Sequence, residues 1–451
     1  MLPIQLLESL EKAKGFNKDA FEKIHYSGDQ VTSIRINRKK WSLNESIQDT
    51  SLAIHSAIPW TGDGYYLASR PSFTFDPLFH AGCYYVQEAS SMFLEQAFKQ
   101  TVDLSNSIKV LDLCASPGGK STHIQSLISS DSILVSNEVI RSRANILKDN
   151  IIKWGCENVI ITNNDPRDFS KLENYFDVIV VDAPCSGSGL FRRDPEAINE
   201  WSENNVQLCS QRQQRILADV WPSLKEDGIL IYSTCSYSRE EDEEIKKWVC
   251  DNFSVENRLL KLDPDWGITE SGGGYRFWPD KVKGEGFFIA CFQKKEGSNE
   301  KPLRIKNKAE QTNKKELEII EKWVNPGSRI FIKYNNTVYA WQVNHYTDFS
   351  FLLEQLRVIY SGILIGELMR DKLVPDHALA MSTILSDSIN RLELSHSESL
   401  RYLQRKELTT EIEKKGWVLI TFMGHPLGWA NVLQNRINNY YPKELRILKD
   451  L

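Results

Sequence analysis

The sequence predicts an α/β protein built around a mostly parallel sheet, with smaller α+β regions before and after it. Three observations predict this fold class. Apolar runs alternate with helical segments between residues 108 and 292, and a glycine-rich turn follows the first run. The residues before and after this region lack that regular alternation. The expected strands are Ile108–Leu113, Ile133–Ser136, Val159–Thr162, Val178–Val181 and Ile229–Ser233, with an antiparallel pair near Phe287–Cys291.

The length of 451 residues indicates several domains, because single hydrophobic cores rarely grow beyond about 250 to 300 residues. A helix is expected at Leu6–Phe21, and strands at Gly362–Glu367 and Trp417–Thr421. Residues 297–315 carry six Lys or Arg against two Glu, which is typical of a solvated linker. We therefore expect an N-terminal α+β appendage at 1–100, a central domain at 101–296, the linker at 297–315, and two C-terminal domains at 316–385 and 386–451.

The composition is that of a soluble globular protein, with 41% apolar and 25% charged residues. The net charge of −5 does not predict a polyanion partner, so any nucleic-acid surface must come from local clusters of Lys and Arg. No signal peptide or membrane span is recognisable, and we expect a cytoplasmic protein with no membrane partner. The eight cysteines contain no C-x-x-C pair, which predicts free thiols and no metal site.

The first candidate site is a glycine-rich loop between a buried strand and a helix. Glycine lets the backbone approach a ligand closely, and the amino end of a helix offers free N–H groups. The spacing is not the G-x-G-x-x-G of dinucleotide-binding folds, and a glycine-rich turn alone is weak evidence. The candidate cofactor loop comprises Cys114, Ala115, Ser116, Pro117, Gly118, Gly119 and Lys120.

Acidic residues follow three successive predicted strands. Glu138 lies 20 residues after Gly118, where α/β nucleotide sites place the group that holds ribose hydroxyls, and Asp165 and Asp182 follow the next two strands. Any one of them is more often a helix cap or turn residue. Together they favour a ligand site at the carboxyl ends of the strands.

Two cysteines follow two of the central strands. Cys185 comes after Val178–Val181 and Cys235 after Ile229–Ser233. A single such cysteine is usually inert and buried. Since the ends of two strands in a doubly wound sheet can be adjacent, the pair beside a nucleotide-type site instead favours reactive thiols facing one cavity.

These stretches resemble the Sun-type (NOL/NOP/Sun family) RNA cytosine-5 methyltransferases. Within that family, the segments around Glu138 and Asp165 resemble the bacterial RsmF-like subgroup, whose members act on 16S rRNA. A departure is Asn164-Asp165-Pro166-Arg167, where relatives often have glycine beside the acid. The matching stretches are Asp112–Lys120, Asp182–Gly187, Arg192–Pro195 and Tyr232–Ser236 in the core, and Ser33–Asn37, Tyr84–Ser91, Gly284–Phe288, Pro375–Ala380 and Gly424–Trp429 outside it.

The resemblance implies a Rossmann-like S-adenosylmethionine-dependent methyltransferase core, an N-terminal α+β RNA-binding appendage and a C-terminal PUA-like RNA-binding region. It implies that the loop from Cys114 to Lys120, with Glu138, Asp165 and Asp182, surrounds S-adenosylmethionine. It also implies that Cys235 is the nucleophile and that Cys185 assists release. The candidate catalytic set is Cys235, Cys185, Asp182 and Lys120.

The chemistry of cytosine explains why a thiolate is needed. Carbon 5 is too poor a nucleophile to take a methyl group, but addition of a thiolate at carbon 6 turns carbon 5 into an enamine carbon that can. An acid such as Asp182 can hydrogen-bond or protonate the N3 edge of the base, although a purely structural role fits the sequence equally well.

RNA is the expected partner, either 16S rRNA or the 30S subunit, and no DNA partner is expected. The enzyme is expected to be a monomer. Arg192 and Arg193 are candidate phosphate contacts, with an idle surface pair as the equal alternative. Tyr84, Tyr85 and Trp429 are candidates for base stacking, but aromatic residues more often lie in cores.

Other functions stay open at the level of sequence. The enzyme could methylate tRNA or another RNA, or the chain could be a non-catalytic RNA-binding ribosome assembly factor, which the intact candidate catalytic set disfavours. A nicotinamide-dependent oxidoreductase is disfavoured by the glycine spacing. A DNA cytosine methyltransferase would attack with the Pro-Cys thiol, Cys185, so the indispensable cysteine separates the two classes.

Overall fold

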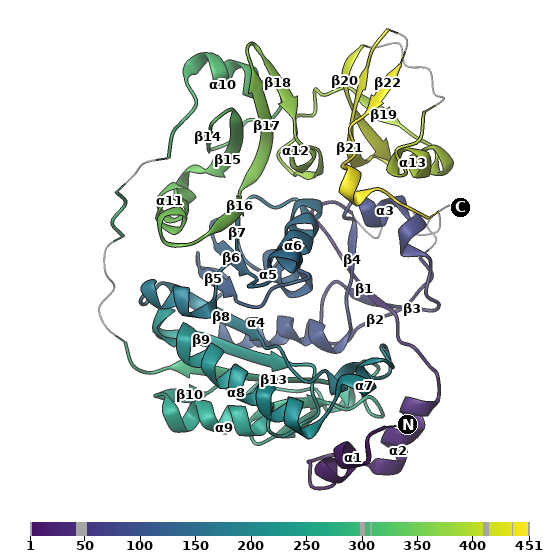
Figure 1. The fold of residues 1–451 in the computed structure, drawn as a ribbon, viewed down its shortest axis with the longest axis vertical. Coiled ribbons are helices and arrows are strands. Elements are labelled where there is room, and N and C mark those ends of the chain that lie inside the picture. Colours follow the sequence, from purple (N-terminus) through teal and green to yellow (C-terminus); the bar gives the residue numbers. More distant parts are fainter. Residues whose placement is uncertain are drawn as a thin grey trace.

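The structure is a computed structural model that describes residues 2–41, 52–297, 303–306, 309–408, 415–434 and 436–449. Within these residues, the strands form one central sheet, one N-terminal sheet and two C-terminal sheets. Figure 1 shows the C-terminal sheets at one end of the molecule and α1 (Ile4–Leu10) and α2 (Lys18–Tyr26) at the other. The expected α/β core with flanking α+β regions is confirmed.

The central sheet has ten strands in the order β11-β12-β13-β9-β8-β5-β6-β7-β16, with β10 also paired to β13. The middle strands β7, β6, β5, β8 and β9 are parallel, and β13 is antiparallel to β9. The bounds are β5 Lys109–Asp112, β6 Ile133–Asn137, β7 Val159–Thr162, β8 Phe176–Asp182, β9 Leu224–Thr234, β10 Val255–Asn257, β11 Thr269–Ser271, β12 Gly274–Phe277, β13 Phe287–Lys294 and β16 Val358–Ser361.

The strand order reverses at β5, which pairs with β6 on one side and β8 on the other. Ligands of open α/β sheets bind at such a switch point, beyond the carboxyl ends of the strands. The five parallel strands predicted in this region are present, and the antiparallel pairing expected near Phe287–Cys291 is that of β13 with its neighbours β9 and β12. The strands β10, β11 and β12 are only three or four residues long and carry too little periodicity to be recognised individually.

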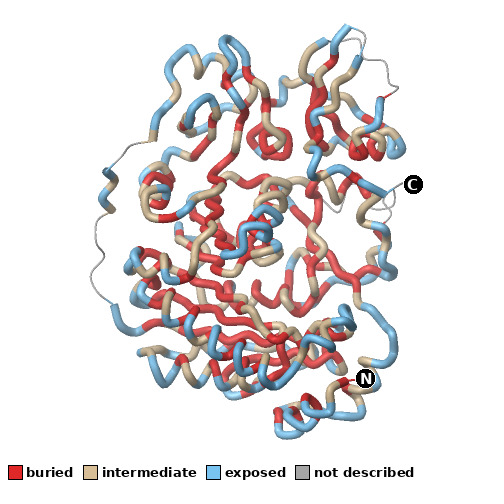
Figure 2. The backbone as a smooth tube through the Cα atoms, in the orientation of Figure 1, coloured by how far each residue is buried: buried red, intermediate tan, exposed pale blue. Residues whose placement is uncertain are grey.

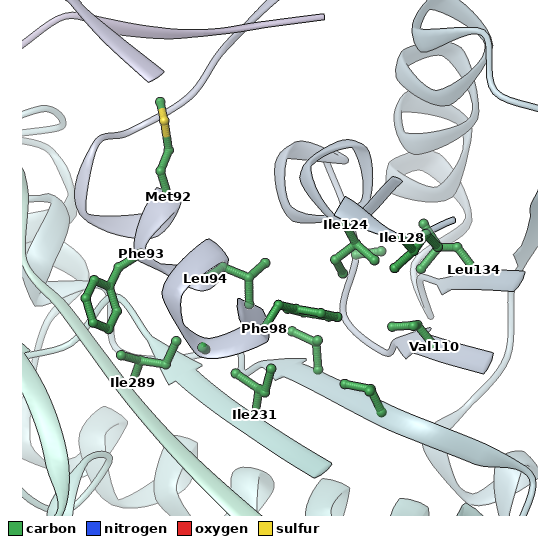
Figure 3. Close-up of a cluster of buried hydrophobic side chains, with 14 of the residues drawn as sticks. Met92, Phe93, Leu94, Phe98, Val110, Ile124, Ile128, Leu134, Ile231 and Ile289 are labelled. Atoms are coloured by element: carbon green, nitrogen blue, oxygen red, sulfur yellow. The ribbon is translucent and has the colours of Figure 1, made fainter. Parts of the chain in front are cut away.

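Helices cover both faces of the central sheet. Figure 3 shows Phe98 of α4 and Ile124 of α5 beside Val110 and Ile231 of the strands, in a cluster that also holds α6 side chains. Figure 2 shows buried strands running through the middle of the molecule. The other face packs against α8 and α9. The bounds are α4 Leu94–Thr101, α5 Gly119–Leu127, α6 Arg141–Trp154, α7 Ala197–Glu200, α8 Glu203–Val220 and α9 Glu243–Asn252.

The N-terminal region begins with two helices where one was expected. The prediction of a single helix at Leu6–Phe21 was wrong, because the chain turns between α1 and α2 and Gly15 takes a φ of +83°, which side chains rarely adopt. The sheet that follows has the order β2-β3-β1-β4. The bounds are β1 Ser33–Ile36, β2 Ile54–Ala57, β3 Gly64–Leu67, β4 Tyr84–Val86 and the short helix α3 Pro77–His80.

The two C-terminal sheets contain the two strands expected there, as β17 and β20. The last sheet shares a hydrophobic core with the N-terminal sheet, in which Ile34 and Tyr84 lie with Leu400 and Ile420. The bounds are β14 Arg329–Tyr334, β15 Thr337–Gln342, β17 Ile363–Met369, β18 Lys372–Pro375, β19 Arg391–Glu393, β20 Gly416–Phe422, β21 His425–Val432, β22 Ile437–Asn439, α10 Lys314–Ile320, α11 Tyr346–Gln355, α12 His377–Met381 and α13 His396–Leu403.

Burial decides the role of two candidate stacking residues. Tyr84 is fully buried and donates to Asp76, while Trp429 is 1% exposed and its indole donates to the Asp376 carbonyl. Both are core residues, as aromatic side chains usually are.

Among the described residues, no helix is long and apolar enough to cross a membrane. The predicted linker falls partly on residues 298–302 and 307–308, which lie outside the described residues.

The strand β16 connects the C-terminal region to the central sheet. It pairs antiparallel with β7, and the Gly362 amide donates to the Val159 carbonyl at 2.9 Å. The pairing covers the edge of β7, which would otherwise present unpaired backbone groups. Tyr360 of β16 is 4% exposed and lies in the same cluster as Ile161 of β7.

Replacing Tyr360 with alanine should therefore destabilise the whole chain. Loss of a buried aromatic ring costs about 3 kcal/mol of unfolding free energy, measured by urea unfolding followed by circular dichroism. Tyr334→Ala is the matched control, because Tyr334 lies in the same region but is 74% exposed. Equal losses in the two variants would contradict a tightly packed junction at β16.

Candidate active site

The glycine-rich loop leads from β5 into α5 and is held on two sides. Its start is fixed by the Ala115 amide, which donates to the Asn137 carbonyl at the end of β6 at 2.8 Å. Gly118 precedes α5 with a φ of +113°, and a Cβ there would lie 3.3 Å from Leu147 of α6. A side chain at this position would thus meet both backbone strain and close packing.

The helix α6 holds the middle of the loop. Arg143 donates to the Ser116 carbonyl at 3.1 Å, and the Ser116 hydroxyl donates back to the Arg143 carbonyl at 3.0 Å. Asn150 donates to the Pro117 carbonyl at 2.8 Å. The loop is therefore rigidly placed before any ligand arrives. Burial raises the pKa of the Cys114 thiol far above its ordinary value, so Cys114 is a neutral lining residue.

Acidic side chains stand beyond the ends of β6, β7 and β8, as the sequence predicts. Glu138 is 4% exposed and accepts from the Ile140 amide at 2.9 Å, with Arg143 3.7 Å away. Asp165 accepts from the Arg167 amide and caps a short helical turn, which is the ordinary role of an acid at this place. Asp182, at the end of β8, is about one-third exposed.

A further carboxyl group, Asp112, stands at the end of β5. It is fully buried, its Oδ2 accepts from Ser121 at 2.6 Å, and its Oδ1 has no hydrogen-bond partner among the described residues. Burial raises the pKa of Asp112 to about 7, and the charge of Asp182 adds to the rise, while the Ser121 hydrogen bond opposes it. A buried carboxylate oxygen without a partner is unusual in folded proteins and can accept a hydrogen bond from a ligand.

Lys120 and Asp182 form an ion pair between α5 and β8. The Lys120 Nζ lies 2.8 Å from Asp182 Oδ2, and the Ser233 hydroxyl donates to Asp182 Oδ1 at 2.8 Å. Burial lowers the pKa of Lys120, but the charge and hydrogen bond of Asp182 outweigh it, so the pKa is raised overall. The Lys120 ammonium is therefore positively charged and faces Asp182 and, at longer range, Cys235.

The two cysteines lie against each other. Cys185 Sγ is 3.0 Å from Cys235 Sγ, although the residues are 50 positions apart. The hydrogen bond to Cys235, with burial and the Cys235 and Glu241 charges, raises the pKa of Cys185 well above its ordinary value. Either sulfur can be the donor in this contact, and the raised pKa favours the protonated form of Cys185. All eight cysteines are free thiols, and these two are partly exposed.

The loop after Cys185 approaches the Cys235 backbone closely. The Gly189 amide donates to the Cys235 carbonyl at 2.9 Å, and a Cβ on Gly189 would lie 2.7 Å from that oxygen. Arg192 donates to the carbonyls of Gly284 and Asp29, so it ties segments together and is not free to contact phosphate. Arg193, next to it, is exposed.

Two residues of the site were not predicted from the sequence. Asp112 was part of a recognised motif, and its position at a strand end beside the glycine loop was a usable signal. Glu241 belongs to an acidic run that is typical of a solvated surface, but it is fully buried beneath the cysteines. No local signal identifies it, because its burial depends on α8 and two distant loops.

Family models match three parts of the chain. The model described as 16S rRNA methyltransferase RsmB/F matches residues 99–293. The N-terminal domain of 16S rRNA methyltransferase RsmF matches residues 2–89, and the methyltransferase RsmF PUA domain matches residues 389–447.

Curated relatives match over nearly their full length. Proteins named ribosomal RNA small subunit methyltransferase F are 32% identical in Psychromonas ingrahamii, over 92% of this chain and 90% of the relative, and 30% identical in Shewanella woodyi, over 94% and 92%. A third, from Vibrio parahaemolyticus, is 30% identical over 92% of this chain and 91% of its own.

Solved structures share the fold. A methyltransferase homologue from Pyrococcus horikoshii is 28% identical with a TM-score of 0.53, over 65% of this chain and all of its own. NSun6 from the same organism, solved with SFG, has a TM-score of 0.56 over 65% of this chain and 98% of its own, and at 19% identity it shows the fold alone. With a Rossmann-like methyltransferase core between an RsmF-type N-terminal domain and a PUA domain, the chain belongs to the RsmF family of 16S rRNA methyltransferases.

Proposed function

We propose that this protein methylates carbon 5 of a cytidine in 16S rRNA, using S-adenosylmethionine and a covalent adduct with Cys235. The observation that carries the proposal is the 3.0 Å approach of the Cys185 and Cys235 sulfurs at the carboxyl ends of β8 and β9. Two thiols in contact, beside a glycine loop and a Lys–Asp pair, supply a nucleophile and a proton donor in one place.

The residues around the glycine loop fit S-adenosylmethionine. The orphaned Asp112 oxygen suits an ammonium group, Glu138 suits ribose hydroxyls, and the loop from Cys114 to Gly119 offers backbone at close approach. Asp165, which follows β7, is a candidate to line the pocket for the adenine ring of the cofactor. When bound, the cofactor supplies an electrophilic methyl group on a sulfonium. SFG, in the NSun6 structure, is an analogue of S-adenosylmethionine.

Cys235 is proposed as the nucleophile because the Thr-Cys cysteine has that role in the family that the chain resembles, and the raised pKa of Cys185 favours the protonated form of the other sulfur. The Cys235 thiolate forms a bond to carbon 6 of cytosine, and the electron pair of the ring makes carbon 5 an enamine carbon that accepts a methyl group. Carbon 5 then loses its proton to a base. The bond to sulfur breaks with its electron pair returning to Cys235, and the Cys185 S–H donates to that leaving thiolate.

Asp182 is proposed to hold the cytosine edge. Its Oδ1 accepts a hydrogen bond from the Ser233 hydroxyl and its Oδ2 pairs with Lys120. The carboxylate is thereby fixed at the end of β8, directly before the loop that carries Cys185. In its protonated form the Asp182 carboxyl donates its proton towards N3, which neutralises the negative charge that builds up on the ring during attack. Lys120 keeps Asp182 in place and partly offsets the extra charge.

RNA is the proposed substrate class because the family acts on 16S rRNA and the chain contains a PUA domain. The base must leave its stack to reach Cys235, which costs a few kcal/mol and favours loops over perfect duplex. No observation in the structure favours tRNA or a purely scaffolding role.

The assignment of the two cysteines predicts opposite defects. Cys235→Ala should abolish both methylation and covalent capture of RNA, since no sulfur remains to attack carbon 6. Cys185→Ala should form the adduct and fail to release it. Incorporation of labelled methyl groups and a shifted protein–RNA band on a denaturing gel measure the two steps. Normal turnover by Cys235→Ala would refute the assignment.

The cofactor assignment predicts weaker binding for Glu138→Gln. Loss of hydrogen bonds to a charged carboxylate should raise the Kd for S-adenosylmethionine about tenfold to a hundredfold, measured by calorimetry on the protein without RNA. Glu203→Gln, an exposed acid in the first turn of α8, is the matched control and should bind normally. Equal Kd values for the two variants would show that Glu138 does not contact the cofactor.

The substrate assignment predicts where 5-methylcytosine appears. The enzyme with labelled methyl donor should modify 16S rRNA, supplied either free or as 30S particles, and leave tRNA unlabelled. The Cys235→Ala variant gives the background, and mapping of the modified base identifies the cytidine. Label confined to tRNA, or present in the variant, would contradict this substrate.

A further inference from the structure

Glu241 lies on the segment between β9 and α9 and binds the residues that directly follow the two cysteines. It is fully buried, and its backbone is held by the Tyr232 hydroxyl, which donates to the Glu241 carbonyl at 2.6 Å. Its carboxylate lies between the loop that carries Cys185 and the loop that carries Cys235, and it contacts neither sulfur by a hydrogen bond.

One carboxylate oxygen joins the two loops. The Ser186 hydroxyl donates to Glu241 Oε2 at 2.5 Å, and the Ser236 hydroxyl donates to the same oxygen at 2.6 Å. Ser186 directly follows Cys185, and Ser236 directly follows Cys235. A single buried oxygen therefore anchors the neighbouring residue of each cysteine.

The other oxygen holds the Cys185 loop from two directions. Glu241 Oε1 accepts from the Ser186 amide at 2.8 Å and from the Gln213 side chain of α8 at 3.2 Å. Gln213 is also fully buried, and it donates to the Pro184 carbonyl at 3.1 Å. The residues on both sides of Cys185 are thus fixed through Glu241 and Gln213.

We infer that Glu241 is a positioning residue that sets the distance between the Cys185 and Cys235 sulfurs, by binding Ser186 and Ser236 with one carboxylate. The expected effect of Glu241 on methylation rests on the proposed roles of the two cysteines. The expected effect of Glu241 on the distance between the sulfurs does not depend on those roles. Glu241 touches no reacting atom and acts through the two serines.

The geometry favours a carboxylate at this place. Four donors converge on two oxygens: two hydroxyls, one backbone amide and one side-chain amide. Glutamine has the same size, but its NH2 group would replace the acceptor Oε2, so the Ser186 and Ser236 hydroxyls would turn their protons away and both short hydrogen bonds to a charged oxygen would be lost. Its negative charge also contributes to the raised pKa of Cys185, after the hydrogen bond to Cys235, burial and the Cys235 charge.

The test measures how readily the two sulfurs join. Diamide oxidises two thiols to a disulfide by taking two electrons and two protons, and the rate depends on how often the sulfurs meet. Mass spectrometry of peptides follows the Cys185–Cys235 disulfide in the full-length protein. Glu241→Gln should form it about tenfold more slowly than the wild type, because the loops are no longer held together.

Glu95→Gln is the matched control. Glu95 is also a buried carboxylate with four partners, including a hydroxyl and a backbone amide, but it lies in α4 and binds Thr61, Gly62, Lys99 and His123. The Glu95→Gln variant should have a lower melting temperature but form the Cys185–Cys235 disulfide at the wild-type rate. Ser236→Ala removes one contact to Glu241 and decides the question if Glu241→Gln fails to fold.

Activity provides the second readout. With RNA and S-adenosylmethionine, Glu241→Gln should lower kcat about tenfold and leave KM for RNA unchanged, because the binding surface is intact while the reacting sulfurs are displaced. Disulfide formation at the wild-type rate in a folded Glu241→Gln or Ser236→Ala protein would overturn the inference. Methylation by Cys235→Ala would overturn the proposed function alone and leave the disulfide result standing.

Discussion

The parallel pairing of β8 with β9 is the constraint on which the whole site depends. Asp182 pairs with Ser233 in this register, so the two strands end together and their loops leave the sheet side by side. The Ser233 hydroxyl then donates to Asp182, and the cysteine of each loop meets the other at 3.0 Å. A shift of one residue would turn these side chains to opposite faces of the sheet.

The strand order also brings the glycine-rich loop and the ion pair of Lys120 with Asp182 to the cysteines. β5 lies at the switch point, so its glycine loop reaches the ends of β8 and β9, and Lys120 of α5 meets Asp182 across the gap. The pKa values of Asp112, Cys185 and Lys120 are all raised, which favours the neutral form of the two acids and the charged form of the ammonium. Perturbed pKa values of this kind cluster at functional sites.

The flanking regions are part of the same body rather than separate appendages. β16 extends the central sheet, and the last sheet packs against the N-terminal one in a shared cluster. The PUA domain is therefore joined to the core that carries the cysteines by packed strands and side chains. The domain limits inferred from the sequence, and the roles of the site residues, stay predictions.

The sequence by itself determined the strands of the core, the glycine loop and the placement of Asp182, Cys185 and Cys235 at strand ends, because these follow from local apolar patterns and chain neighbours. Only the tertiary structure decided which of these residues meet. The contact between the two sulfurs and the hydrogen bonds from Ser186 and Ser236 to Glu241 join different loops of the site, and the Asp112 oxygen is left without a partner by the packing around it. Strand order and register, which local patterns do not encode, set these distances.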